Sequence, residues 1–435
     1  MKESIDYCKS LKEGDYSNKD TFAKLADTIT TAEKAYTNVS DTRLNYKAAR
    51  DTLEKVRVAL TKNVSTESSN PKTFRILDKK TVIKEMGAGI NLGNTMDGGL
   101  YDSSETGWQA YKTTKDYIKA LHDAGYNTVR IPVTWGSHIN DDYTIDEAWI
   151  NRVQEIVDYC VDQDMYAIVN IHHDGAANHD DRGNNTPACW LDTYSQNIEK
   201  VYQKYEGVWN TIANRFKDYD EHVIFESMNE VTDAHGTATN EDDAVLNALN
   251  QLFINTVRAT GSNNTKRWLA ITGRFATTAA ITTMPEDTLA DSGDLGTTRL
   301  MFAVHIYKSN NNVRWSYDDL KQWQSSMSSS YKNVGNLDSN MPIYVGEYGV
   351  RTKAQNGSAT GYNNAERALN YEMCAAIADF YNAVPVVWDQ GTGNYLGVET
   401  EQGLFTDWNR PELKPVYDDV VHGMIRGTLE AGKST

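Results

Sequence analysis

The sequence has few of the features that tie a chain to metals, disulfides or membranes. Its only cysteines are Cys8, Cys160, Cys189 and Cys374, and they form no CxxC pair and have no metal-ligand spacing. They therefore decide neither the redox compartment nor the disulfide state. No apolar run approaches the roughly 20 residues that cross a bilayer, so the sequence predicts no transmembrane helix.

Positive charge is also scarce. The chain of 435 residues has 43 lysines and arginines against 60 aspartates and glutamates, a net charge of −17 at pH 7. This balance argues against nucleic acid and anionic membrane surfaces as partners, so we expect a neutral partner. The polar start, Met1–Ser4, lacks the apolar core of a signal peptide, and a chain trimmed of its export signal would look the same.

The chain divides into two parts by residue pattern. From Ser4 to about Leu60, apolar residues recur at helical spacings, as in Phe22, Leu25 and Ile29, which predicts a small all-α bundle. Residues 61–72 have linker composition. We predict a helical N-terminal module over residues 1–66 and a second domain over residues 72–430. The module's role stays open between a spacer, attachment to a wall or sugar, and packing against the second domain.

The second part alternates short apolar runs with amphipathic helical stretches. Alternation of this kind implies parallel strands, and eight units close most simply into a (β/α)8 TIM barrel. An open, doubly wound sheet is the alternative, but no GxGxxG follows the first run. The eight runs are 87–93, 128–133, 167–172, 223–228, 268–272, 300–306, 343–346 and 384–388.

Two of these runs are followed by a glutamate, Glu230 and Glu347. A carboxylate at a strand end is costly to desolvate, so the pair indicates a functional site. Paired carboxylates are the chemical minimum for cleaving a glycosidic bond, and a separation of roughly 5 Å would mean retention of configuration. We expect Glu230 to be the acid with a raised pKa, and Glu226 to be a buried partner of Arg130.

Polar and aromatic groups also end the other runs, and a barrel brings all these ends to one face. Arg130 beside Glu347 would keep that glutamate ionised, Asn229 suits a sugar 2-hydroxyl, and Tyr307 would donate to the second oxygen of Glu347. Tryptophans offer flat faces for sugar rings. The predicted substrate-binding residues are Asn94, Arg130, Trp135, His172, His173, Asn229, His305, Tyr307 and Trp388, with Tyr101, Trp190 and Trp408 as candidates for more distant subsites.

Two alternatives come from other classes of protein. His172, His173 and Asp174 are adjacent, and a metal-dependent hydrolase would use them as ligands if the backbone turns at this strand end. If no metal binds, the two histidines and His305 are hydrogen-bond donors that orient substrate. The second alternative is a sugar-binding protein on the same fold that does not cleave its ligand.

Several short segments of the chain, taken together, are similar to a known family. They are 89–95, 130–135, 170–173, Asn229-Glu230, 305–307, 346–349 and Trp388-Asp389, and over roughly Phe74 to Met424 they resemble the retaining endoglucanases of glycoside hydrolase family 5. The resemblance implies a TIM barrel that needs no metal or cofactor, with Glu230 as acid/base and Glu347 as nucleophile. It also implies that Arg130, His172, His173, Asn229, His305, Tyr307 and Trp388 line the cleavage subsite.

The resemblance further implies a substrate and a location. The substrate would be β-1,4-linked glucan of plant cell walls, hydrolysed by a secreted or cell-surface enzyme outside the cell. We expect a monomer without nucleic acid or membrane partners. Many members have proline where this chain has Val231, and asparagine where it has Gln390. These departures leave xyloglucan, mixed-linkage β-glucan and mannan open as substrates.

Overall fold

A computed structural model gives the architecture of the chain. It describes residues 2–15, 19–37, 49, 52–53, 56, 73–99, 103–108, 112–175, 189–193, 197–232, 240–278, 281, 284–288, 290, 298–307, 317–349, 364–389, 394–395, 398–399, 425 and 427–428. Within these ranges, no helix has both the length and the apolar character of a membrane span.

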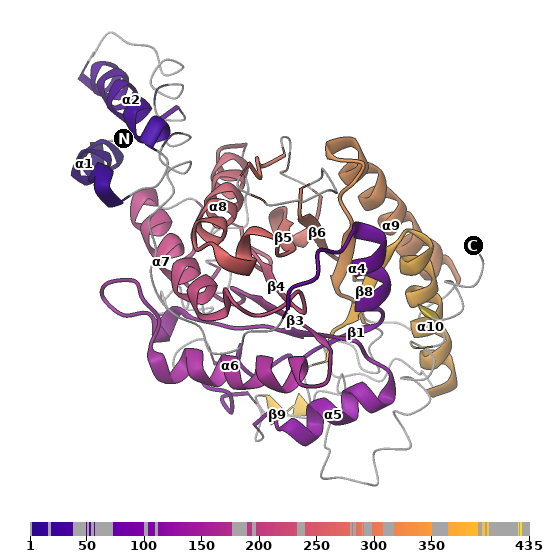
Figure 1. Cartoon of the computed structure of the whole chain (residues 1–435). Coiled ribbons are helices and arrows are strands. Elements are labelled where there is room, and N and C mark those ends of the chain that lie inside the picture. The colour runs from indigo at the N-terminus through magenta and orange to yellow at the C-terminus, as the bar shows by residue number, and fades with distance from the viewer. Residues whose placement is uncertain are drawn as a thin grey trace.

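Eight parallel strands close into a barrel in the order in which they occur in the sequence (Figure 1). Closure comes from the last strand, because Val386 pairs with Gly89 of the first. All eight predicted runs are strands, which confirms the (β/α)8 barrel and makes the open-sheet alternative wrong. The strands are β1 (Gly89–Asn91), β2 (Thr128–Ile131), β3 (Tyr166–Asn170), β4 (Val223–Glu226), β5 (Leu269–Thr272), β6 (Leu300–His305), β7 (Ile343–Glu347) and β8 (Ala383–Val387), with a separate antiparallel pair, β9 (Asn394–Tyr395) and β10 (Val398–Glu399).

Helices surround the barrel (Figure 1). Their ends follow local sequence signals: the side chain of Thr114 accepts the N–H of Tyr117 at the start of one helix, and Gly125 ends it with a left-handed φ of 106°. The helices are α4 (Lys79–Met86), α5 (Lys115–Ala124), α6 (Glu147–Val161), α7 (Ile198–Phe216), α8 (Asn240–Ala259), α9 (Tyr317–Leu337) and α10 (Asn364–Phe380), with short 3-10 turns η2 (Gly136–His138), η4 (Ser262–Thr265) and η5 (Arg274–Ala276).

Alternate strand residues build two apolar layers. Tyr166 and Ile168 of β3 pack with inward residues of the other strands, and Met86 of α4 joins this inner cluster. Their neighbours Ala167 and Val169 belong instead to the larger cluster between strands and helices. The period of two therefore also decides which polar residues can point into the barrel, among them Arg130 and Glu226.

The N-terminal helices have a small core of their own. α1 (Lys2–Ser10), the turn η1 (Glu13–Asp15) and α2 (Lys19–Thr37) bury Ile5, Cys8, Leu25 and Ala32 together with Leu53. α1 contacts α7 of the barrel (Figure 1). The predicted linker, residues 61–72, lies outside the described residues, so the boundary between residues 66 and 72 stays a prediction.

Candidate active site

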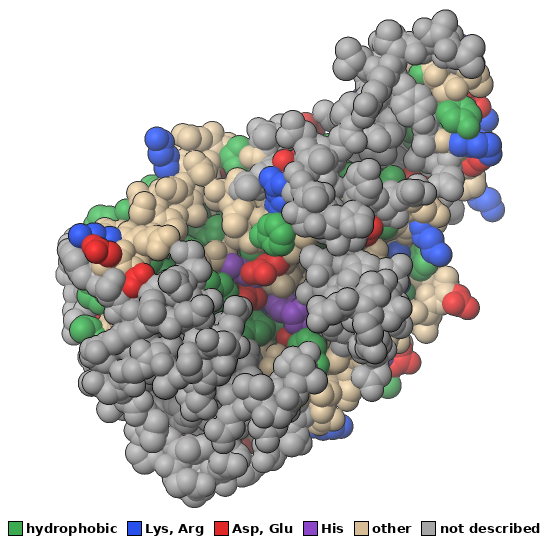
Figure 2. Space-filling view, turned by 180° about the vertical axis from the view of Figure 1, so that it is seen from behind, with side chains coloured by type: hydrophobic (Ala, Val, Ile, Leu, Met, Phe, Trp, Pro, Cys, Tyr) green, Lys and Arg blue, Asp and Glu red, His purple; other side chains and the backbone are tan. Residues whose placement is uncertain are grey.

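The carboxyl ends of the strands carry the polar residues that the sequence singled out. The face turned to the viewer in Figure 2 is hollowed near its middle, and histidine and acidic side chains gather there. A closed parallel barrel brings residues to this face from strands that are far apart in the sequence. The predicted convergence of strand ends on one site is therefore present.

Glu230 and Glu347 lie close together. One carboxylate oxygen of each, and a ring nitrogen of His305, all lie within 4.8 Å of one another. A register shift between Val304 and His305 sets Glu347 opposite His305, as bulges near active sites often re-aim a side chain. This bound fits the roughly 5–5.5 Å between the carboxyl groups of retaining glycosidases better than the 6.5–9.5 Å that leaves room for an attacking water.

Arg130 is fully buried below this pair, and all three nitrogens of its guanidinium group donate hydrogen bonds. Nε and Nη2 donate to the two oxygens of Glu226 at 2.7 and 2.8 Å. Nη1 donates to Glu347 Oε1 at 2.8 Å and to Asn91 Oδ1 at 2.9 Å, and Nη2 also donates to Asn229 Oδ1 at 2.9 Å. The structure thus confirms that Arg130 lies beside Glu347 and that Glu226 is its buried partner.

Each oxygen of Glu347 has a donor. Arg130 binds Oε1, and the hydroxyl of Tyr307 donates to Oε2 at 3.0 Å, as predicted. Burial raises the pKa of Glu347 above its usual value, against the lowering effect of the charges on His305 and Arg130, and the charge of Glu230 adds to the rise. We expected Arg130 to keep Glu347 ionised; Arg130 does lower the pKa of Glu347, but desolvation outweighs it and the pKa is raised.

Glu230 behaves in the opposite way to the expectation. Burial raises its pKa, but the hydrogen bond with His305 Nδ1, 2.6 Å from Glu230 Oε1, and the positive charges nearby hold the pKa below its usual value. The pKa of His305 is raised, since the attraction of Glu347 and Glu230 exceeds the cost of burying the cation. Both directions favour His305 over Glu230 as the group that holds the proton of this pair before substrate binds.

The remaining residues of the predicted subsite surround this pair. The Trp388 ring stacks on His172 with ring centres 5.7 Å apart and an angle of 5° between the planes. The Trp388 ring also needs Gly93, because a Cβ there would lie 2.7 Å from Trp388 Cζ2. Asn94 follows β1 with a left-handed φ of 58°, and its contact with sugar stays a prediction.

One prediction about this face is wrong, and the alternative of a metal site misplaces one ligand. Trp135 is fully buried, and its Nε1 donates to the carbonyl of Asn170, so it is a core residue that no sugar can reach. Asp174 does not join the two histidines as a ligand. It accepts the backbone N–H of Trp135 and, at 2.6 Å, the indole N–H of Trp190.

Of the three aromatic candidates for more distant subsites, Trp190 lies among the described residues. Trp190 is half-buried, and the ammonium of Lys204 lies 4.9 Å from its ring centre. Tyr101 and Trp408 lie outside the described residues.

Sequence reasoning missed several groups that support the site. Tyr344 donates its hydroxyl to Glu226 Oε2, and Asn170 bonds both His172 and Glu226. Their inward parity on β7 and β3 is a signal that could have found them. Asp97 was also missed, although it follows the 89–95 segment by two residues. It takes the place of Asp174 beside His172 and His173, and these three have the donor types and closeness of a metal site.

Comparisons with known proteins agree with this geometry. The profile described as cellulase, glycosyl hydrolase family 5, matches residues 79–394. The chain is 31% identical over 384 residues to Endoglucanase A of Paenibacillus barcinonensis, covering 81% of this chain and 91% of that protein. It is 34% identical over 363 residues to Cellulase/esterase CelE of Acetivibrio thermocellus, covering 80% of this chain but only 40% of that longer protein.

A solved structure is similar over most of this chain. A family 5 xyloglucanase from Paenibacillus pabuli superposes with a TM-score of 0.68 at 30% identity, covering 80% of this chain and 99% of that one.

Proposed function

The chain belongs to glycosyl hydrolase family 5, and we propose that it is a retaining endo-β-1,4-glucanase that uses Glu347 and Glu230. The observation that carries the proposal is the spacing of two carboxylates and an imidazole within 4.8 Å at the carboxyl ends of the strands. This spacing suits attack by a carboxylate on the sugar rather than attack by a water held between two carboxyl groups.

In the first step, a Glu347 oxygen attacks the anomeric carbon and the glycosidic C–O bond breaks. The departing oxygen takes a proton from Glu230, which receives it from His305 Nδ1 across their 2.6 Å hydrogen bond. Arg130 and Tyr307 hold the two Glu347 oxygens in place, so the carboxylate is fixed before substrate arrives. The product is a glycosyl ester of Glu347.

In the second step, a water molecule attacks the anomeric carbon of that ester and releases Glu347. Glu230 removes the proton of the water, the reverse of its first role. Asn229, whose oxygen Arg130 binds at 2.9 Å, keeps its amide N–H groups for a sugar hydroxyl. Trp388 gives the sugar an apolar face on which to stack, and His172 and His173 complete the subsite.

The proposed substrate is the β-1,4-glucan of plant cell walls. The relatives named endoglucanases support a glucan, and the xyloglucanase supports xyloglucan as the alternative. Mixed-linkage β-glucan and mannan would be cleaved by the same chemistry. Such polymers are too large to enter a cell, so we propose that the enzyme acts outside the cell, and that it does so as a monomer without a metal.

A panel assay tests the proposal. Purified protein with carboxymethylcellulose should release reducing ends while viscosity falls early, because internal bonds are cut first. Xyloglucan, barley β-glucan and glucomannan in parallel reactions rank the alternative substrates. Binding of cello-oligosaccharide without release of reducing ends would favour the sugar-binding alternative, and activity lost to a chelator and restored by zinc would favour the metal-dependent one.

A further inference from the structure

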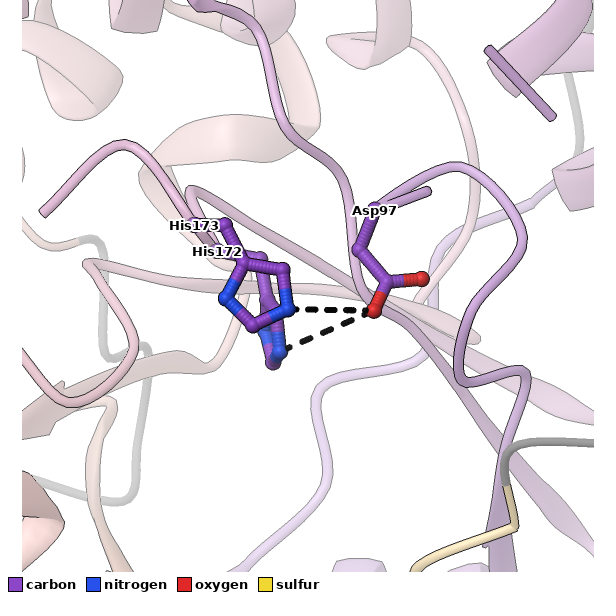
Figure 3. A group of neighbouring side chains, drawn as sticks. All are labelled: Asp97, His172 and His173. Carbon is purple, nitrogen blue, oxygen red and sulfur yellow. Dashed lines mark ion pairs between the residues drawn. The ribbon is translucent and has the colours of Figure 1, made fainter. Parts of the chain in front are cut away.

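Three side chains from two strand ends meet at one carboxylate oxygen. Asp97 Oδ2 lies 3.5 Å from Nε2 of His173 and 3.9 Å from Nε2 of His172, and all three side chains point toward one another (Figure 3). Asp97 is fully buried, and its Oδ2 has no hydrogen-bond partner among the described residues. A buried carboxylate oxygen without a partner is costly, so this oxygen needs a donor.

Asn170 fixes which nitrogen of His172 carries the proton. The Asn170 oxygen accepts the backbone N–H of Val133 at 3.1 Å, so its amide nitrogen is the atom that faces His172 Nδ1, at 3.2 Å. An amide nitrogen only donates, and His172 Nδ1 must therefore accept. The proton of His172 then lies on Nε2, the nitrogen that faces Asp97.

This assignment counts against a metal ion among the three residues. A metal would need a lone pair on His172 Nε2, and the contact with Asn170 leaves that nitrogen protonated. Burial and the charges of His173, Arg130 and His305 lower the pKa of His172 well below its usual value, so the ring is neutral. The site therefore presents N–H donors to Asp97 rather than ligands to a cation.

We propose that Asp97 is a positioning residue whose Oδ2 accepts the Nε2–H groups of His173 and His172, leaving His173 Nδ1 as an acceptor for a substrate hydroxyl. This inference rests on the proposed function. Asp97 is itself fixed, because its Oδ1 accepts the backbone N–H of Thr95 at 2.9 Å. The contacts of 3.5 and 3.9 Å are longer than hydrogen bonds and shorten when substrate binds, as such contacts often do.

The two histidines have different parts in this arrangement. The side chain of His172 is 2% exposed and its Nδ1 faces Asn170, whereas the side chain of His173 is 20% exposed. The backbone N–H of His173 donates to Thr134 Oγ1 at 3.3 Å, which fixes the backbone position from which the His173 side chain extends. His173 is thus the ring that reaches substrate, and Asp97 decides which nitrogen it presents.

The first measurement needs no variant. Long-range 1H–15N NMR of the full chain labelled in histidine reports the tautomer of each ring, with His172 and His173 assigned from single His→Gln variants. Both should be Nε2–H tautomers. An Nδ1–H tautomer for His173 would overturn the proposal whatever the activity of the enzyme.

The second measurement uses Asp97→Asn. Asparagine keeps an oxygen for the N–H of Thr95 but turns an NH2 group toward two N–H donors, so His173 should change tautomer. We expect kcat/KM for cellotetraose to fall about 10²-fold, the cost of a misplaced substrate-orienting group. In a His173→Ala background the same change should cost little more, because Asp97 acts through His173. A full additional loss in that background would contradict the proposal.

Controls separate this inference from the proposed function. Asp142→Asn changes an exposed turn aspartate and should leave kcat/KM at the wild-type value. If wild-type enzyme does not cleave cellotetraose, the proposed function fails. If it does, and Asp97→Asn retains full activity and the wild-type tautomers, this inference alone fails. Zinc binding by calorimetry that Asp97→Asn abolishes would replace it with a metal site.

Discussion

Two of the fully buried arginines, Arg130 and Arg267, lie at opposite ends of the barrel, and their partners differ in kind. Arg130, at the carboxyl ends, binds Glu226, Glu347 and two amide oxygens. Arg267, just before β5, binds the carbonyls of Phe216, Tyr219, Asp220 and Val223 and the side-chain oxygen of Asn264. Both arginines are buried, and in both all three guanidinium nitrogens donate hydrogen bonds. Only the first has partners that can gain a proton or attack a carbon, so the partners mark the functional end.

The largest expected effect follows from removing the nucleophile at the functional end. Glu347→Gln keeps the shape and the hydrogen bond to Arg130 but cannot form the glycosyl ester, so kcat for cellotetraose should fall about 10⁴-fold or more, as for nucleophile loss in other hydrolases. The matched control is Glu85→Gln on α4, whose carboxylate binds Arg75 and Tyr166. That control should retain wild-type kcat. Residual activity above a few per cent in Glu347→Gln would place the nucleophile elsewhere.

Changing each arginine to lysine tests the comparison itself. Arg130→Lys loses the two-pronged contact with Glu226 and frees Glu347 Oε1, so kcat should fall about 10²-fold. Arg267→Lys should leave kcat of the folded enzyme unchanged and lower stability instead, by about 1–3 kcal/mol for each carbonyl left without a donor. Urea unfolding with kcat measured in parallel checks both. Equal losses of kcat in the two variants would break the distinction between the two ends.

The stacking surface should contribute less. Trp388→Ala removes the indole that stacks on His172, and we expect KM for cellotetraose to rise roughly tenfold, since aromatic stacking is worth about 0.5–1.5 kcal/mol. Trp268→Ala at the amino end is the matched change. Its indole N–H donates to the Leu77 carbonyl, so it should lower stability and leave KM unaltered.

The smallest expected effects are in the pH dependence of activity. Glu347 must be ionised, and its raised pKa puts the acid limb of kcat/KM above pH 4.5, with activity rising as pH increases. One proton must stay on the Glu230–His305 pair, and the raised pKa of His305 puts the alkaline limb above pH 6.5, with activity falling as pH increases. His305→Gln should move the alkaline limb, and it should also move the acid limb to higher pH because Glu347 loses the positive charge of His305. An unchanged alkaline limb in that variant would remove His305 from the proton path.

The fold and the reacting pair could be predicted because both depend on simple periodicity. Eight apolar runs specify eight strands, and a closed barrel of parallel strands leaves one face for Glu230 and Glu347. Details that depend on the direction of a side chain could not be predicted. Trp135 follows a strand, but its indole turns into the core. The low pKa of Glu230 depends on a 2.6 Å contact with His305, a residue that is remote in sequence.

The stereochemistry of the first product tests the double displacement most directly. Proton NMR of cellotetraose during the first minutes of hydrolysis distinguishes the two anomers of the new reducing end before they interconvert. Carboxylate oxygens within 4.8 Å predict that the β-anomer appears first. Initial formation of the α-anomer would mean that water attacks the sugar directly, and would contradict the assignment of Glu347 as the nucleophile.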